Sequence, residues 1–250
     1  MSSSVLSMSR QRAAVVALFV SIASALSLLT APDAKAAGFS LVFQDNFNGS
    51  SLNRSDWGVF DGSKRGDRVA ENVFVNDGMM TLRTRPINGE WKGAGVSASR
   101  ANQQKYGKYE IRVRFDKGYG VRCAGLLWPA NGTWPPEVDF YEIPGTNADR
   151  SINTVTNHYG TRKNHKMMHG KYSGDFTKWH VVGVEWTPNE LRYTMDGKVM
   201  LTQRANIPKT PMWFGIQTKA GLGGKVPNAS TPRVVDLDVD WVKIYKYNGR

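Results

Sequence analysis

The chain has 250 residues, of which 40% are hydrophobic and 11% aromatic, with 25 glycines and 11 prolines. This composition excludes a disordered chain, a coiled coil and a collagen-like repeat, and the length suits one large domain. A single cysteine excludes an internal disulfide framework and any zinc or iron–sulfur site built from several cysteines. The formal net charge of +12 favours anionic partners without identifying one.

The first segment, residues 1–36, has the layout of a secretory signal peptide. Two arginines and no acid precede an apolar run from Ala13 to Leu29, and Ala34-Lys35-Ala36 offers the small residues that a signal peptidase reads. A retained membrane anchor is the alternative, but the run is short for a membrane span and contains three serines. We therefore expect cleavage after Ala36, secretion, no stable membrane insertion afterwards, and one domain over residues 37–250.

From Phe39 onward the sequence predicts short strands joined by turns. Residues 109–116 alternate strictly, with Tyr, Ile, Val and Phe on one face and charged residues on the other. Residues 191–195 repeat the pattern, and Asp196-Gly197 then supplies a two-residue hairpin turn. Residues 235–240 alternate valine or leucine with aspartate. Many short strands without an amphipathic helix predict an all-β fold, either a two-sheet sandwich or a barrel.

Three acids gather in the stretch Glu137-Val138-Asp139-Phe140-Tyr141-Glu142. Glu137 and Asp139 are two residues apart, so both project from one face of a strand. Glu142 would point the opposite way in a regular strand, but a β-bulge at Phe140-Tyr141 would return it to that face. Three carboxylates on one face repel one another, and folding alone gives no reason to place them there. We interpret them as an active site, with a solvated edge strand as the alternative.

Glycoside hydrolysis is a reaction that needs two carboxyl groups across a sugar bond. One of them is ionised and attacks, and the other is protonated and donates its proton. A third acid between them can share a proton with the nucleophile and so tune the pair. The residues therefore indicate two reacting carboxyl groups and a helper, without assigning the order of their roles.

The pattern Glu137-x-Asp139-x-x-Glu142 resembles the active-site signature of glycoside hydrolase family sixteen, in the longer, bulged version of laminarinase-like members. The flanking segments are similar to the family in the same order; they are Phe43 to Trp57, Glu71 to Leu82, Tyr106 to Glu110, Phe176 to Gly197 and Val239 to Tyr245. The resemblance implies a β-jelly-roll of two curved antiparallel sheets with a polysaccharide across the concave face. It also implies that Glu137 is the nucleophile, Glu142 the general acid/base and Asp139 the assisting carboxylate.

The same resemblance implies a retaining hydrolase of internal β-linkages, with a β-1,3- or mixed-linkage β-1,3-1,4-glucan as substrate and no cofactor required for catalysis. Three alternatives stay open: a transglycosylase, which shares the covalent intermediate; a hydrolase of another polysaccharide, including an anionic one; and a non-catalytic glucan-binding protein. Nucleic acid is not expected as a partner, because no basic cluster is denser than residues 162–166. We expect a monomer.

Five further residues are candidates for binding the substrate. Aromatic rings stack on sugar faces, so Trp128 and Trp134 beside the acids are candidates for subsites, with the core as the alternative. The resemblance adds Glu110, Asn72 and His158 as residues of the cleft. Solvent exposure is the rival interpretation for Glu110, and a structural role is the rival for His158.

The remaining acids and histidines have less specific patterns. Asp240 aligns with a family position that helps to hold a structural Ca²⁺, although a solvated acidic face is the usual meaning of alternating aspartates. His165 and His169 lie four residues apart without an accompanying acid, and we interpret them as loop residues. We expect His180 to be structural and Cys123 to be a buried thiol.

Overall fold

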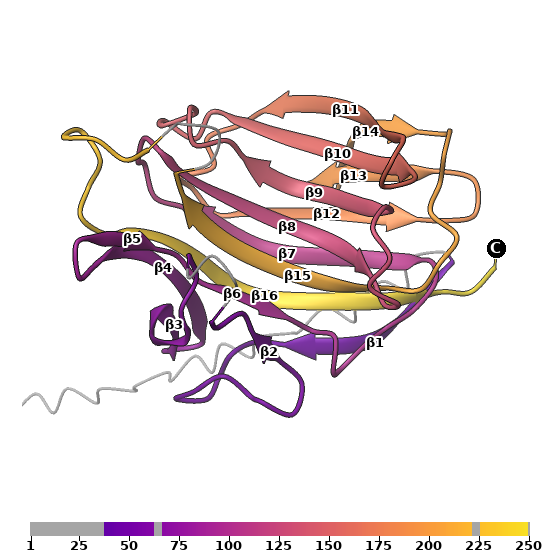
Figure 1. The fold of residues 1–250 in the computed structure, drawn as a ribbon. Helices are drawn as coiled ribbons and strands as arrows, with labels where there is room; N and C mark the ends of the chain where they lie inside the picture. The colour runs from indigo at the N-terminus through magenta and orange to yellow at the C-terminus, as the bar shows by residue number, and fades with distance from the viewer. Residues whose placement is uncertain (1–37, 63–66, 222–225, 250) are drawn as a thin grey trace, which may run out of the picture. The chain divides into compact units, whose positions relative to one another are not determined.

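A computed structural model describes residues 38–62, 67–221 and 226–249 of the chain, and the expected signal segment lies outside them. The described residues form two antiparallel sheets that pack face to face (Figure 1), with one short 3₁₀ turn, η1 (Ala70–Asn72). Within these ranges no helix is long and apolar enough to cross a membrane. The observed architecture confirms the all-β sandwich and excludes the barrel.

The first sheet has nine strands in the order β14-β13-β12-β7-β16-β4-β3, with β1 beside β16 and β5 beside β4. Its strands are β1 (Phe39–Asp45), β3 (Val73–Asn76), β4 (Met79–Ile87), β5 (Glu90–Lys92), β7 (Gly107–Phe115), β12 (His180–Trp186), β13 (Leu191–Met195), β14 (Lys198–Gln203) and β16 (Val235–Tyr247). The long strand β16, yellow in Figure 1, pairs with β4 on one side and β7 on the other, and thereby joins the early and late parts of the chain.

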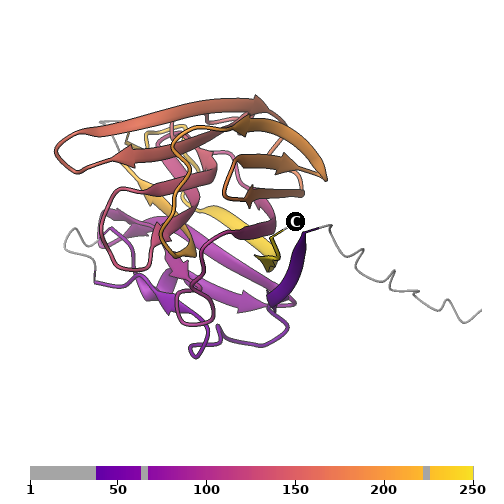
Figure 2. The ribbon, with the colours of Figure 1, turned by 90° about the vertical axis from the view of Figure 1, so that its right-hand side faces the viewer.

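The second sheet has seven strands in the order β11-β10-β9-β8-β15-β6-β2. Its strands are β2 (Gly58–Val59), β6 (Gly95–Ser97), β8 (Val121–Pro129), β9 (Glu137–Ile143), β10 (Ile152–Gly160), β11 (His165–Ser173) and β15 (Met212–Ala220). The view turned by 90° (Figure 2) shows the early, indigo and purple strands on one side of the molecule and the later, orange strands on the other. The strand with the three acids, β9, lies between β8 and β10.

Alternating side chains explain why these segments form strands. In β7 every odd-numbered residue from Gly107 to Phe115 is buried, while each residue between them is partly exposed. The buried set packs in one core with inward residues of the other sheet, among them Val138, Phe140 and Phe214. At the predicted hairpin turn between β13 and β14, Asp196 and Gly197 have positive φ angles of 49° and 76°, as a tight two-residue hairpin requires.

A ladder of ion pairs covers the outer face of the nine-stranded sheet. It comprises Arg83 with Asp236 at 2.7 Å, Arg114 with Asp238 at 2.9 Å, and Arg112 with Asp240 at 2.5 Å. The alternating aspartates of β16 therefore pair with arginines from the neighbouring strands. This face lies on the opposite side of the sandwich from the three acids of β9.

Candidate active site

A β-bulge brings the three acids of β9 to one face. Gly125 of β8 pairs with Tyr141, and the next residue, Leu126, pairs with Asp139, so Phe140 is the extra residue. Phe140 and Tyr141 are both fully buried on the core side, which leaves Glu142 pointing outward with Glu137 and Asp139. The predicted bulge is confirmed, and Glu137, Asp139 and Glu142 all face away from the core.

Glu137 lies at the start of β9, beside a cavity with aromatic walls. Its Oε2 accepts a hydrogen bond of 2.7 Å from Nε1 of Trp134. The cavity has a volume of about 440 Å³, and Trp128 and Trp213, which pair across β8 and β15, line it together with Glu137. The structure thus places Trp128 and Trp134 beside the acid, as expected, and adds Trp213.

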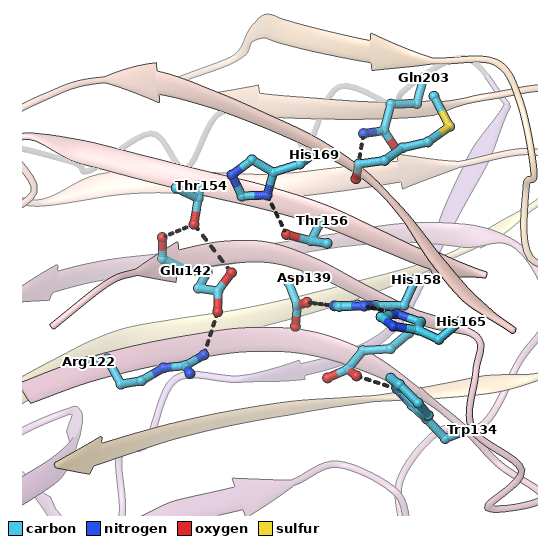
Figure 3. A network of polar contacts seen from close by, with 12 residues as sticks. Arg122, Trp134, Asp139, Glu142, Thr154, Thr156, His158, His165, His169 and Gln203 are labelled. Carbon is cyan, nitrogen blue, oxygen red and sulfur yellow. Dashed lines mark hydrogen bonds and ion pairs between the residues drawn. The ribbon is translucent and has the colours of Figure 1, made fainter. Parts of the chain in front are cut away.

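Two histidines in contact with each other connect Asp139 to Trp134 (Figure 3). His158 Nε2 lies 3.0 Å from Asp139 Oδ2, and His158 Nδ1 lies 2.8 Å from His165 Nε2. His165 also packs against Trp134, with ring centroids 4.7 Å apart. Consecutive contacts therefore connect the carboxyl group of Glu137 to that of Asp139. They run from Glu137 through Trp134, His165 and His158 to Asp139.

Burial gives Glu137 and Asp139 unusual protonation behaviour. Desolvation, followed by the nearby charge of Asp139, raises the pKa of Glu137 to about 7. Desolvation and then the charge of Glu142 raise the pKa of Asp139 well above its ordinary value. The charge of each nearby carboxylate raises the pKa of its neighbour, so the loss of one proton from this group disfavours the loss of the next.

Glu142 has a different environment at the other end of the bulge. It forms an ion pair with Arg122 of β8, and the Thr154 hydroxyl donates a hydrogen bond of 3.3 Å to its Oε2 (Figure 3). A second cavity, of about 250 Å³, is lined by Glu142, Arg122, Thr154 and His169. The side chain of Glu142 is 20% exposed, so it remains accessible to a ligand on this face.

The histidines of β11 correct one expectation. His165 and His169 are not loop residues, because both belong to the regular strand β11 that pairs with β10 along its whole length. His169 Nδ1 lies 3.0 Å from the hydroxyl of Thr156, and His165 contacts His158 as described above. Neither histidine has an acid beside it in the sequence, and their partners in the structure, His158 and Thr156, both lie on β10. His180, expected to be structural, lies 2.7 Å from Asp196 in the other sheet.

Two residues assigned to the cleft lie elsewhere, and both assignments are corrected. Glu110 is on β7 in the nine-stranded sheet and pairs with Lys108 at 2.8 Å, so it is on the opposite side of the sandwich from Asp139. The alternation of β7 forces this position, because its inward face is entirely apolar or glycine. Asn72 is fully buried and accepts a hydrogen bond from Arg85, so it cannot contact a polysaccharide.

The expected calcium ligand is engaged by an arginine. Asp240 pairs with Arg112, whose guanidinium already supplies the positive charge that a Ca²⁺ would bring to this carboxylate. Among residues 38–62, 67–221 and 226–249, no group of three or more His, Cys, Asp or Glu side chains could hold a metal ion. A Ca²⁺ held by Asp240 together with backbone oxygens stays a prediction. The single thiol, Cys123, is buried as expected.

Three residues of the site were missed from the sequence: Trp213, His165 and Arg122. Trp213 alternates with buried Met212 and Phe214, which was a visible signal for an outward aromatic residue. Arg122 interrupts an otherwise apolar strand, and such an arginine needs a partner. His165 gave no usable signal, because its role depends on the register between β10 and β11.

Together the fold and the site define a class: a two-sheet β-sandwich that carries three carboxyl groups and an aromatic cavity on the outer face of one sheet. The family model of Glycosyl hydrolases family 16 matches residues 62–243. The chain belongs to glycosyl hydrolases family 16, which confirms the resemblance seen in the acidic motif and its flanks.

Individual relatives agree with this assignment. The chain is 26% identical over 247 residues to the endo-1,3-1,4-beta-glycanase ExsH of Rhizobium meliloti (strain 1021), covering 84% of this chain and 52% of the relative. It is 25% identical over 276 residues to the glucan endo-1,3-beta-glucosidase A1 of Niallia circulans, covering 88% of this chain and 40% of the relative. The chain thus spans about half the length, or less, of these two curated relatives.

A solved structure shows the same fold. The catalytic domain of an endo-1,3-beta-glucanase (laminarinase) from Thermotoga petrophila RKU-1 superposes with a TM-score of 0.72 at 19% sequence identity. The match covers 84% of this chain and 99% of that domain. The jelly-roll arrangement of two antiparallel sheets is therefore confirmed.

Proposed function

We propose that this protein is a retaining, endo-acting hydrolase of a β-1,3- or mixed-linkage β-1,3-1,4-glucan. The observation that supports it most strongly is the bulged strand β9, which presents Glu137, Asp139 and Glu142 on one face in three different environments. Two carboxyl groups with distinct surroundings are what a double displacement needs.

In this reaction Glu137 attacks the anomeric carbon while Glu142 protonates the departing glycosidic oxygen. Glu142 then takes a proton from a water molecule while the water oxygen attacks the anomeric carbon, which breaks the bond to Glu137 and releases the sugar with its configuration retained. Once Asp139 holds a proton, its charge no longer opposes the ionisation of Glu137, which must be a carboxylate to attack. Trp134 fixes the Glu137 carboxylate through its 2.7 Å hydrogen bond.

The aromatic cavity supports a sugar polymer as the substrate. Trp128, Trp213 and Phe60 line the space beside Glu137, and flat aromatic surfaces suit the apolar faces of sugar rings. Internal cleavage is proposed because both curated relatives are named as endo-acting enzymes. The β-1,3 and β-1,3-1,4 linkages are proposed because the two curated relatives carry these linkages in their names.

Export is proposed on the sequence alone. Residues 1–36 carry the charged, apolar and small-residue parts of a signal peptide, and a polymer too large to enter a cell has to be met outside it. We propose that residues 37–250 form the secreted, monomeric catalytic domain.

The test is the release of reducing ends from laminarin and from mixed-linkage glucan. The wild-type protein is expected to release a ladder of oligosaccharides from at least one of them, and Glu137→Gln is expected to lose activity by at least about 10³-fold. Near-native activity of Glu137→Gln would overturn the proposal. Chain lengthening of labelled oligosaccharides, without net release of reducing ends, would indicate a transglycosylase instead.

A further inference from the structure

Arg122 lies between two cavities on the outer face of the seven-stranded sheet. On one side it points toward Glu142 and forms an ion pair with that acid (Figure 3). On the other side it lines a separate cavity of about 160 Å³, together with Arg68, Gln217 and Lys219. This smaller cavity is large enough for a single charged substituent of a sugar, and Arg122 lies between it and the proposed general acid/base.

Positive charge dominates this smaller cavity. Arg68 and Lys219 both pair with one carboxylate, that of Asp67, at 3.2 and 2.5 Å. Arg122 pairs with the carboxylate of Glu142, so the three cations that line this cavity are paired with only two carboxylates. All three cations have side chains between 20% and 22% exposed. The group therefore has one positive charge in excess, which solvent screens only in part, and this charge attracts an anion that enters.

The ion pair between Arg122 and Glu142 is in conflict with the proposed reaction. A general acid must be protonated before it can donate, and a protonated Glu142 no longer carries the charge with which Arg122 is paired. Arg122 would then be a half-buried cation without its counterion, which is costly. A second anion close to Arg122 removes that cost during the step.

We propose that Arg68, Arg122 and Lys219 form a subsite for an anionic substituent of the polysaccharide, a sulfate ester or a carboxylate. This inference rests on the proposed function, since it takes Glu142 as the acid/base. The bound anion takes over the guanidinium of Arg122, whose planar fork matches both sulfate and carboxylate oxygens. Glu142 is thereby released from Arg122 at the moment when a substrate is in place.

The binding experiment uses the inactive Glu137→Gln protein with three polymers of one backbone: laminarin, carboxymethyl-laminarin and laminarin sulfate. The anionic derivatives are expected to bind at least tenfold more tightly than laminarin at moderate salt. Arg122→Gln and Lys219→Gln, each added separately, are expected to remove this margin. The derivative with the larger gain in affinity over laminarin shows whether the subsite prefers a carboxylate or a sulfate.

The matched control is Lys198→Gln, which removes one exposed positive charge on the other sheet. It reports the general attraction of a basic protein for polyanions, and it is expected to keep the margin. Equal affinity for all three polymers, or a margin that survives in both Arg122→Gln and Lys219→Gln, would overturn the subsite. Because Arg122→Gln and Lys219→Gln are made separately, the test still decides if one of them fails to fold.

Catalysis separates this inference from the proposed function. In the active protein the ratio of kcat/KM for an anionic derivative to that for laminarin is expected to fall at least tenfold on Arg122→Gln, and to stay constant on Lys198→Gln. A wild-type protein that cleaves none of the three polymers contradicts the proposed linkage, while the binding margin still decides the subsite. Cleavage of laminarin alone, with no margin in binding, rejects the subsite and leaves the hydrolase.

Discussion

Two histidines position the carboxyl pair, and the second of them, His165, touches neither acid. Its Nε2 lies 2.8 Å from His158, and its ring packs on Trp134, so it supports the partner of Asp139 and the partner of Glu137 at once. If His158 donates its Nε2 proton to Asp139, its Nδ1 must accept, and His165 then has to be the donor. His165 thereby selects the tautomer of His158.

His165→Phe and His165→Gln separate these two contacts. Phe keeps a ring against Trp134 without the donor, whereas Gln offers a donor without the ring. Loss of a hydrogen bond worth about 1 kcal/mol predicts a fall in kcat of roughly fivefold for His165→Phe, with KM within a factor of about two. Steady-state kinetics on laminarin measure the split between kcat and KM.

His180→Phe is the control for this prediction, because it removes a histidine hydrogen bond of similar length, to Asp196, away from the site in the nine-stranded sheet. Its kcat is expected to equal that of the wild type. A positioning role for His165 is contradicted if His165→Phe changes only the thermal stability, or raises KM while kcat stays constant.

Among individual residues, the sequence predicted the three acids of the site well and the residues that contact them poorly. Glu137, Asp139 and Glu142 are visible because three like charges within six residues need a reason. Arg122 and His165 are distant in the chain from the acids that they serve, and only strand register brings them near. Glu110 was misplaced because the family resemblance put it in the cleft, whereas the alternation of β7 favoured the outward position that the structure shows.

Single strands were predicted accurately, whereas the sequence alone did not predict the order of the strands in the sheets. The alternation of β7 and the Asp196-Gly197 turn are local signals, and the structure confirms both. The bulge in β9 was predicted from the requirement that Glu142 share a face with Glu137. The pairing of β16 with β7 and β4 joins residues more than a hundred positions apart, and no local pattern encodes it.

Arg150 secures the loops at one end of the strands around the site. It is fully buried, and its guanidinium donates hydrogen bonds to the backbone carbonyl oxygens of Asp116, Gly118, Val121 and Asn147 at 2.7 to 3.1 Å. The same group lies over the ring of Phe115. Burial lowers its pKa to about 10, so it still carries its charge at neutral pH. One side chain thus joins the end of β7 to the start of β8 and to the loop before β10.

Arg150→Met is expected to lower the free energy of unfolding by about 3 kcal/mol, because the carbonyl groups are left buried without donors. Arg150→Lys keeps the charge but replaces the planar guanidinium by a single ammonium group that reaches fewer of the carbonyl oxygens, and an intermediate loss is expected. Denaturant unfolding at pH 7 measures both variants. A loss below about 1 kcal/mol for Arg150→Met would mean that water or backbone shifts replace the guanidinium.

For the whole molecule, the site makes folding stability depend on pH. The pKa of Glu137 rises from 4.5 to about 7 on folding, so the folded state binds this proton more tightly than the unfolded chain. The resulting stabilisation is complete below pH 4.5 and is lost as the pH rises through about 7. Asp139, whose pKa is also raised, adds to the effect in the same direction.

Glu137→Gln removes the titrating group and keeps its shape. Between pH 5 and pH 8 the wild type is expected to lose on the order of 2 kcal/mol more stability than this variant. Thermal unfolding over this pH range checks the difference in slope. Parallel curves for the two proteins would show that Glu137 titrates alike in the folded and unfolded chain.

The roles of the two outer acids are the central claim, and azide rescue tests them most directly. The substrate is an aryl β-oligoglucoside whose leaving group needs no protonation. In Glu137→Ala, azide is expected to take the place of the missing carboxylate and to give the α-glycosyl azide. In Glu142→Ala, the covalent intermediate still forms, and azide is expected to give the β-glycosyl azide. The same anomer from both variants, or the reverse assignment, would contradict the account.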